Sequence, residues 1–305
     1  MNSKELKKLK DDLWHSADML RAGAHLAANK YGQPILGLIF LRYADILFKQ
    51  HKPAIDAEYN RLKGSRAEKS IKEVAIEKCG FYLPECAYYD FINNAPDDAN
   101  KATLVKKAME EIEKENDRME GVLPKEVYGQ LVPEEEPELL SKIIRIFKNI
   151  PENIEIDLFG EIYEYFLGNF ALNEGKDGGT FYTPASVVRY MVEVLKPEVG
   201  NKLFLDPACG SGGMFVQTAH YIERHKNKGE QLNLRAYGVE KTQQTVRLAK
   251  MNLVLNNVRG EITHANSYYS DPYDSYGNFD YVMANEAVIC GLTPEKACNI
   301  KEFAA

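Results

Sequence analysis

The sequence predicts an α/β fold in which a helical domain over residues 1–150 precedes a domain over residues 151–305 built around a parallel sheet. Three observations predict this order. Apolar residues recur at intervals of three and four in the first half of the chain, short apolar runs alternate with helical patterns in the last third, and a glycine-rich loop follows the first of these runs. A chain of 305 residues is long enough for two domains with separate cores.

Helices are expected in the first domain because its apolar residues have the spacing of a helix face. Pro34 and Pro53 bracket the most apolar stretch and predict its ends. A further helix is expected after Pro137, where an acidic segment gives way to a periodic run that ends at Phe147. The periodic apolar positions of the first two stretches are Leu13, Met19, Leu20, Leu26, Ile35, Leu36, Ile39, Phe40, Tyr43, Ile46 and Leu47.

The second domain is expected to contain four strands, because four short apolar runs are separated by helical patterns. Strand followed by helix in repetition is typical of a parallel sheet. In such a sheet ligands bind at the edge formed by the carboxyl ends of the strands. The predicted strands are residues 202–205, 234–239, 261–264 and 279–284, and the predicted helices are residues 212–226 and 242–256.

The composition excludes several classes of protein. Basic residues number 38 against 45 acidic ones, so the net charge of −7 does not suit a chain that binds nucleic acid through its overall charge. Five cysteines without a C-x-x-C pair predict reduced thiols, and six histidines without a metal-binding spacing predict no metal site.

No membrane partner is expected, because the longest apolar run, residues 34–40, is far shorter than the roughly 18 residues that span a bilayer. The N-terminal residues contain no apolar segment of the kind that directs secretion. A cytoplasmic location is the expectation.

The strongest chemical signal is the segment FLDPACGSGGMF at residues 204–215. An apolar strand ends in Asp206, and a loop containing Gly210, Gly212 and Gly213 then opens a helix. Glycines let a ligand approach the backbone closely, whereas a carboxylate next to the start of a helix would repel a pyrophosphate. The loop therefore predicts a ligand that carries an amino group, rather than a dinucleotide.

A second acid, Glu240, ends the next predicted strand. In doubly wound folds a carboxylate at this position accepts hydrogen bonds from ribose hydroxyls, which implies an adenosine. An amine and an adenosine without a phosphate site indicate S-adenosylmethionine over NAD. The alternative for Glu240 alone is a solvated acid at a strand end, but its spacing from Gly213 fits one strand–helix–strand unit.

At these residues the chain resembles the N6-adenine DNA methyltransferase family, in particular the modification (M) subunit of type I restriction-modification systems. The resemblance is carried by DPACGSGGMF at residues 206–215, by GTFYTPA at residues 179–185 and by the helical LGLIFLRY at residues 36–43. It implies a Rossmann-like S-adenosylmethionine-dependent methyltransferase domain. It also implies transfer of a methyl group to adenine N6 in DNA, with a specificity (S) subunit, a restriction (R) subunit and a second M subunit as partners.

The resemblance also implies which residues form the site. Thr183 would contact the carboxylate of the cofactor, Asp206 its amino group, Glu240 its ribose and Asn266 its adenine. Two alternatives stay open: Asn266 is also a typical turn residue, and the aromatic pair before Thr183 also suits a core. The residues implied to bind the cofactor are Thr180, Phe181, Tyr182, Thr183, Pro184, Ala185, Asp206, Ser211, Gly212, Gly213, Glu240 and Asn266.

The sequence departs from the family after the fourth strand. The family has Asn or Asp followed by Pro-Pro and an aromatic residue there, which accept hydrogen bonds from the target amine and stack on the flipped base. Here Asn285, the candidate catalytic residue, is followed by Glu286, and both prolines and the aromatic residue are missing. Only four strand candidates are present against the seven of a family domain, so we expect an incomplete parallel sheet in a C-terminally truncated chain.

Two other functions stay open at this stage. One is a non-catalytic module that binds the cofactor or assembles with partner subunits, which the missing Pro-Pro-aromatic segment favours. The other is a small-molecule methyltransferase, which the acidic net charge would suit and the N-terminal resemblance disfavours.

Overall fold

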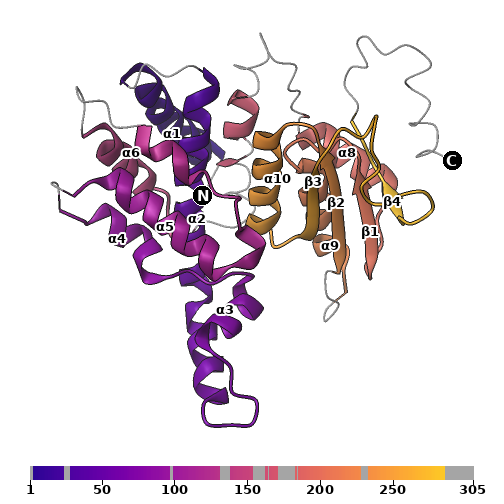
Figure 1. Cartoon of the computed structure of the whole chain (residues 1–305), viewed down its shortest axis with the longest axis horizontal. Helices are drawn as coiled ribbons and strands as arrows, with labels where there is room; N and C mark the ends of the chain where they lie inside the picture. Colours follow the sequence, from indigo (N-terminus) through magenta and orange to yellow (C-terminus); the bar gives the residue numbers. More distant parts are fainter. Residues whose placement is uncertain are drawn as a thin grey trace. The chain divides into compact units, whose positions relative to one another are not determined.

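The computed structural model describes residues 3–23, 28–96, 99–130, 138–153, 162–163, 165–170, 183, 185–227 and 233–285. The chain divides into two compact units, residues 1–177 and 178–305 (Figure 1). Among the described residues, no helix has both the length and the apolar character that a membrane span requires.

The first unit is helical, as the periodicity predicts. Pro34 and Pro53 do not end a helix, however: α2 continues through both of them. A proline removes one helix hydrogen bond, and at Pro34 the nearly complete burial of residues 34–48 outweighs that loss. Pro53 lies at an exposed position of the same helix. The described α-helices of this unit are α1 (Ser3–Gly23), α2 (Ala28–Leu62), α3 (Ile71–Cys79), α4 (Tyr89–Asn93), α5 (Lys101–Glu115) and α6 (Leu139–Lys148), with short 3₁₀ helices η1 (Glu85–Ala87), η2 (Asp117–Met119) and η3 (Lys125–Gln130).

Residues 165–170 pack on the N-terminal helices. The ring centroid of Trp14 in α1 lies 5.5 Å from that of Phe166 and 5.2 Å from that of Phe170. The first compact unit includes this packed segment and extends to residue 177. The domain boundary after residue 150 stays a prediction. Trp14 is the single tryptophan of the chain, so its fluorescence reports on the folding of this unit.

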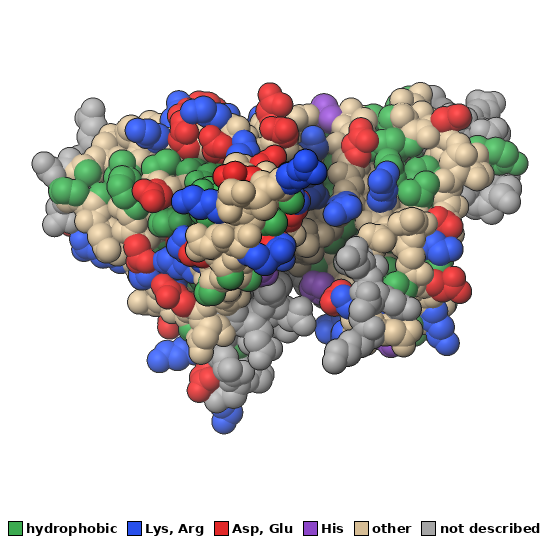
Figure 2. All heavy atoms as spheres, turned by 90° about the horizontal axis from the view of Figure 1, so that it is seen from below, with side chains coloured by type: hydrophobic (Ala, Val, Ile, Leu, Met, Phe, Trp, Pro, Cys, Tyr) green, Lys and Arg blue, Asp and Glu red, His purple; other side chains and the backbone are tan. Residues whose placement is uncertain are grey.

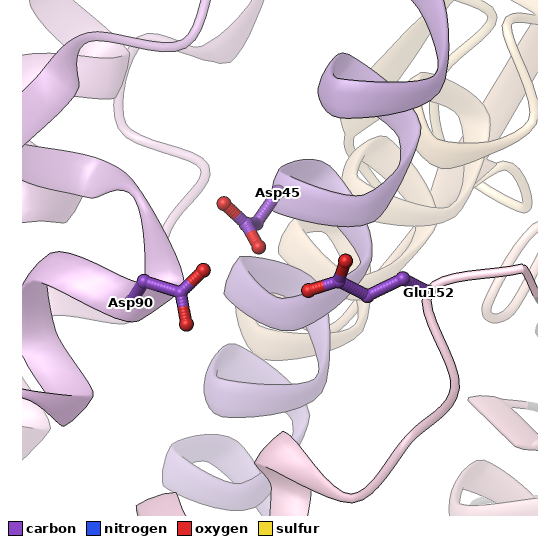
Figure 3. Close-up of side chains that lie close together, drawn as sticks. All are labelled: Asp45, Asp90 and Glu152. Atoms are coloured by element: carbon purple, nitrogen blue, oxygen red, sulfur yellow. The ribbon is translucent and has the colours of Figure 1, made fainter.

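Three carboxylates of the first unit point toward one another from α2, α4 and the segment after α6 (Figure 3). The ammonium group of Lys49 lies 2.9 Å from Asp45, 2.6 Å from Asp90 and 3.8 Å from Glu152. Lys148 pairs with Asp90 and lies 3.1 Å from Glu152. Since cationic side chains neutralise the three acids, the cluster is an ion-pair network that joins the helices, not a geometry built for a metal ion.

This network predicts a pH-dependent contribution to stability. Partial burial raises the pKa of Asp90, but hydrogen bonds from Lys148 and Lys49 outweigh that effect and lower the pKa to about 2. A carboxylate with a depressed pKa stabilises the fold above its ordinary value of 3.8, and the contribution is lost as the pH falls through about 2. The urea midpoint of wild type, followed by Trp14 fluorescence, should therefore exceed that of Asp90→Asn at neutral pH. The difference should shrink below 3.8, and a constant difference would contradict the ion-pair account.

The second unit contains a parallel sheet of four described strands in the order β3-β2-β1-β4. Each strand forms at a run that the sequence predicts, and each helix follows the strand expected to precede it. Phe204 of β1 is level with Ala236 of β2 and with Tyr281 of β4. The elements of this unit are α8 (Ala185–Leu195), β1 (Lys202–Asp206), α9 (Gly213–His225), β2 (Leu234–Glu240), α10 (Gln243–Leu255), β3 (Arg259–His264) and β4 (Tyr281–Val282).

Helices cover one face of this sheet. The core joins Val188 of α8, Phe215 of α9 and Ala249 of α10 to strand residues such as Phe204 and Ala236, which share a face because they are level in the register. The rings of Phe204 and Phe215 meet edge to face at 5.5 Å. The helices therefore fix the sheet from one side and hold the ends of its strands in place.

The segment between β3 and β4 covers part of the other face. Tyr237 of β2, whose side chain alternates with that of Ala236, lies 5.2 Å from the ring of Tyr273 and 5.3 Å from that of Phe279. The Tyr273 hydroxyl is within hydrogen-bond distance of the carbonyl oxygen of Gly238, at 3.0 Å, and of the hydroxyl of Thr263, at 2.9 Å. Burial raises the pKa of Tyr273 to about 12, so its phenol keeps its proton and bridges β2 and β3.

Candidate functional site

Four predicted site positions meet at one edge of the second unit. Asp206 ends β1 and Glu240 ends β2, while Asn266 and Asn285 follow β3 and β4. All four strands are parallel, so these positions lie along the carboxyl edge of the sheet (Figure 1). The order of strands and helices predicted this placement for Asp206 and Glu240, and the family resemblance predicted it for Asn266 and Asn285.

Asp206 is almost completely buried, with 1 % of its surface exposed. Its Oδ1 accepts a hydrogen bond of 3.0 Å from the backbone N–H of Ala208, which turns the chain directly after β1. Burying a carboxylate is costly unless donors and positive charges surround it. An ammonium group of a ligand would provide both at the edge of the sheet.

The loop after Asp206 has the backbone that its glycines predict. Gly210 has a φ of 51° and Gly212 a φ of 77°, both in the left-handed region that disfavours side chains. A Cβ atom built at Gly210 or at Gly213, where α9 begins, would meet no atom within 4 Å. The carbonyl oxygen of Ser211 accepts a 3.0 Å hydrogen bond from Asn252 of α10, which anchors the loop from behind. The loop is thus fixed in place and leaves open space beside Gly210 and Gly213.

Glu240 and Asn266 both bond to the backbone of their own turns. Oε1 of the half-buried Glu240 accepts a 2.7 Å hydrogen bond from the N–H of Thr242. Oδ1 of Asn266 accepts one of 3.1 Å from the N–H of Tyr268, which is the turn geometry that the alternative interpretation of Asn266 predicts. A carboxylate has a second oxygen and an amide has two N–H donors, so both groups keep the capacity to bind a ligand.

Cys209 and Gly238 form a contact that the sequence analysis did not identify. The backbone N–H of Cys209 donates a 3.0 Å hydrogen bond to the carbonyl oxygen of Val239, which joins the loop after β1 to the end of β2. Burial, together with the charges of Asp206 and Glu240, raises the pKa of the Cys209 thiol, so it stays neutral. The spacing of Gly238 two residues before Glu240 is the signal that could have revealed this close approach.

Gly238→Ala is therefore expected to destabilise the second unit by about 1–3 kcal/mol, because the added methyl group overpacks this contact. A Cβ at Gly238 would lie 2.6 Å from Cδ1 of Ile262 and 2.7 Å from Sγ of Cys209. Urea unfolding followed by circular dichroism measures the loss. Gly129→Ala is the matched control, because a Cβ there meets no atom within 4 Å. Equal midpoints for the two variants would show that the contact is not tight.

The segment before α8 contributes one described contact to this edge. The side-chain amide of Asn285 donates a hydrogen bond of 2.8 Å to the hydroxyl of Thr183. Ala185 begins α8. The other predicted members of this segment lie outside the described residues; they are Thr180, Phe181, Tyr182 and Pro184.

Comparison with known families covers most of the chain. The family model described as N-6 DNA Methylase matches residues 154–287, and the model described as HsdM N-terminal domain matches residues 9–147. The chain belongs to the N-6 DNA methylase family. The order of the two matches, helical domain first and sheet domain second, is the order that the sequence predicts.

Individual relatives agree with this family. The chain is 34% identical over 291 residues to the Type I restriction enzyme MjaIX methylase subunit of Methanocaldococcus jannaschii, a match that covers 91% of this chain and 50% of the relative. It is 32% identical over 228 residues to the Type I restriction enzyme HindI methylase subunit of Haemophilus influenzae, covering 71% of this chain and 48% of the relative. The chain thus spans about half the length of these relatives.

A solved structure has the same fold. The methyltransferase subunit of a type I restriction-modification system from Streptococcus thermophilus aligns with a TM-score of 0.72 at 21% identity, covering 92% of this chain and 63% of the other. This similarity confirms the predicted α/β class of an N-terminal helical domain followed by a methyltransferase-like parallel sheet.

Proposed function

We propose that this chain is the modification subunit of a type I restriction-modification system, which transfers a methyl group from S-adenosylmethionine to adenine N6 in DNA. One observation carries the proposal. A buried carboxylate, an open glycine loop and a second carboxylate lie along the edge of a sheet in a chain whose two halves match the HsdM N-terminal domain and the N-6 DNA Methylase models.

The residues at the edge suit this cofactor. Asp206 would bind its amino group, and the open side of Gly213 next to Gly212 and Ser211 would admit its methionine part. Glu240 would accept hydrogen bonds from the ribose hydroxyls and Asn266 would donate to the adenine. Thr183 and its neighbours before α8 would lie at the carboxylate. When bound, S-adenosylmethionine supplies an electrophilic methyl group attached to sulfur.

Asn285 would act on the substrate. Its carboxamide oxygen, at the end of β4, would accept a hydrogen bond from the N6 amine of a target adenine and hold the nitrogen lone pair toward the methyl group. Adenine is paired and stacked inside a duplex, so the target base must leave the stack to reach this edge. Burial of Asp206 and anchoring of the glycine loop would keep the cofactor side of the site rigid while the base enters.

The net charge of the chain is −7, so its overall charge does not attract DNA and partner subunits are needed for DNA binding. On the face seen in Figure 2, acidic and basic side chains lie side by side over much of the surface. We therefore propose that a specificity subunit reads the DNA sequence, that a second modification subunit completes the enzyme, and that a restriction subunit joins the same assembly. Cytoplasmic DNA is the proposed substrate.

The test is a methyl-transfer assay with the chain assembled with its partner subunits, radiolabelled S-adenosylmethionine and duplex DNA that contains the target site. Label is expected in adenine N6, and Asn285→Ala should reduce its incorporation by about 100-fold or more, since it removes an acceptor used in the transition state. Cofactor binding without transfer would favour the alternative of a non-catalytic cofactor-binding or assembly module. Equal transfer by wild type and Asn285→Ala would refute the role of Asn285.

A further inference from the structure

Thr183 and Asn285 are 102 residues apart in sequence and meet at the carboxyl edge of the sheet. The backbone N–H of Met283 donates a 3.0 Å hydrogen bond to the carbonyl oxygen of Leu205, so β4 is held beside β1 up to the level of Asp206. Asn285 follows directly, and Thr183 precedes the first turn of α8. The hydrogen bond therefore ties the end of β4 to the start of a helix that packs on the same sheet.

The direction of this hydrogen bond determines what Asn285 presents to a substrate. A carboxamide has an oxygen that accepts and a nitrogen that donates, and rotation by half a turn exchanges them. In the structure Nδ2 donates to the Thr183 hydroxyl at 2.8 Å. Oδ1, on the opposite arm of the planar amide, then points away from Thr183 as the acceptor.

Only one of the two orientations suits an amine. An exocyclic amine meets Asn285 with N–H donors, so a flipped carboxamide would oppose donor to donor and would not bind it. A threonine hydroxyl accepts from Nδ2, whereas a valine of nearly the same shape offers no acceptor. A hydroxyl can also donate, so Thr183 selects this orientation when its own proton goes to the carboxylate of the cofactor, the contact proposed above, which leaves only its lone pairs for Asn285.

We propose that Thr183 is a positioning residue for the methyl transfer, which fixes the carboxamide of Asn285 so that its oxygen faces the target amine. This inference rests on the proposed function and adds to it, because the proposed contact of Thr183 with the cofactor does not involve Asn285. Thr183 acts here through Asn285 and not on the substrate itself.

The first test observes the amide directly and needs no activity. In full-length protein labelled with ¹⁵N-asparagine, the side-chain amide signals of Asn285 are identified by their loss in Asn285→Ala. Thr183→Val should shift these signals and speed their exchange with water, while Thr183→Ser, which keeps the hydroxyl, should leave them near their wild-type positions. Thr103→Val, at an exposed site on α5, is the matched control and should not move them. Unchanged Asn285 signals in Thr183→Val would overturn the proposal.

The second test is single-turnover methyl transfer by the assembled enzyme at saturating S-adenosylmethionine, so that a change in cofactor affinity does not enter. Thr183→Val is expected to lower the rate by about 10-fold, the effect of one well-placed hydrogen bond, and Thr183→Ser to restore most of it. A wild-type rate in Thr183→Val would overturn the proposal. If the wild-type assembly transfers no methyl group, the proposed function fails, while the amide signals still decide whether Thr183 orients Asn285.

Discussion

Replacing Arg42 by methionine is expected to destabilise the first unit by about 3 kcal/mol, because it removes the cation from a buried pair and leaves polar groups without a donor. The Arg42 side chain is 1% exposed. It donates hydrogen bonds of 3.2 Å to Asp45, 2.6 Å to the carbonyl oxygen of Ile150 and 3.3 Å to that of Lys148. Methionine fills a similar volume and replaces none of these bonds.

Urea unfolding followed by Trp14 fluorescence measures this effect within the first unit. Arg61→Met is the matched control: Arg61 lies on the same helix and pairs with Glu58, but its side chain is 67% exposed. A pair of this kind contributes about 1 kcal/mol or less, so its loss should scarcely move the midpoint. Equal midpoints for Arg42→Met and Arg61→Met would show that the buried network does not hold α2 to the end of α6.

The sheet domain was predictable because its signals are local. Each strand is a short apolar run. The loop after β1 is marked by the acid that ends the strand, Asp206, and by Gly212, whose φ of 77° favours glycine. Since parallel strands place such ends at one edge, the order of elements predicted that Asp206 and Glu240 would lie together, whereas Asn266 and Asn285 were implied by the family resemblance. The family comparison confirms the domain to which this pattern belongs.

Other features depend on contacts between distant parts of the chain. The continuation of α2 through Pro34 is favoured by the burial of the residues that follow it, which local propensity does not include. The sequence identifies Thr183 and Asn285 separately as site residues, but their hydrogen bond joins residues 102 apart and is seen only in the folded chain. The tight packing of Gly238 involves Cys209 and Ile262, which are distant in sequence, so this packing is found only from the structure.

The second large effect is expected at Asp206. Asp206→Ala should weaken S-adenosylmethionine binding by about 100-fold, since it removes a charge-assisted hydrogen bond to the amino group of the cofactor. Asp206→Asn keeps an oxygen that can accept from the N–H of Ala208, so it preserves the turn while removing the charge. It should also bind more weakly than wild type, and circular dichroism should show that it is folded. Wild-type affinity in folded Asp206→Asn would refute the role of the charge.

The central claim is that the carboxyl edge of the sheet is a site for S-adenosylmethionine. Isothermal titration calorimetry of the protein with S-adenosylmethionine tests it most directly, with Asp206→Ala and Asp206→Asn measured beside the wild type. We predict saturable binding at one site per chain in the wild type, and binding weakened by about 100-fold in Asp206→Ala. Absence of binding to the folded wild type, or equal affinity in all three proteins, would contradict the account.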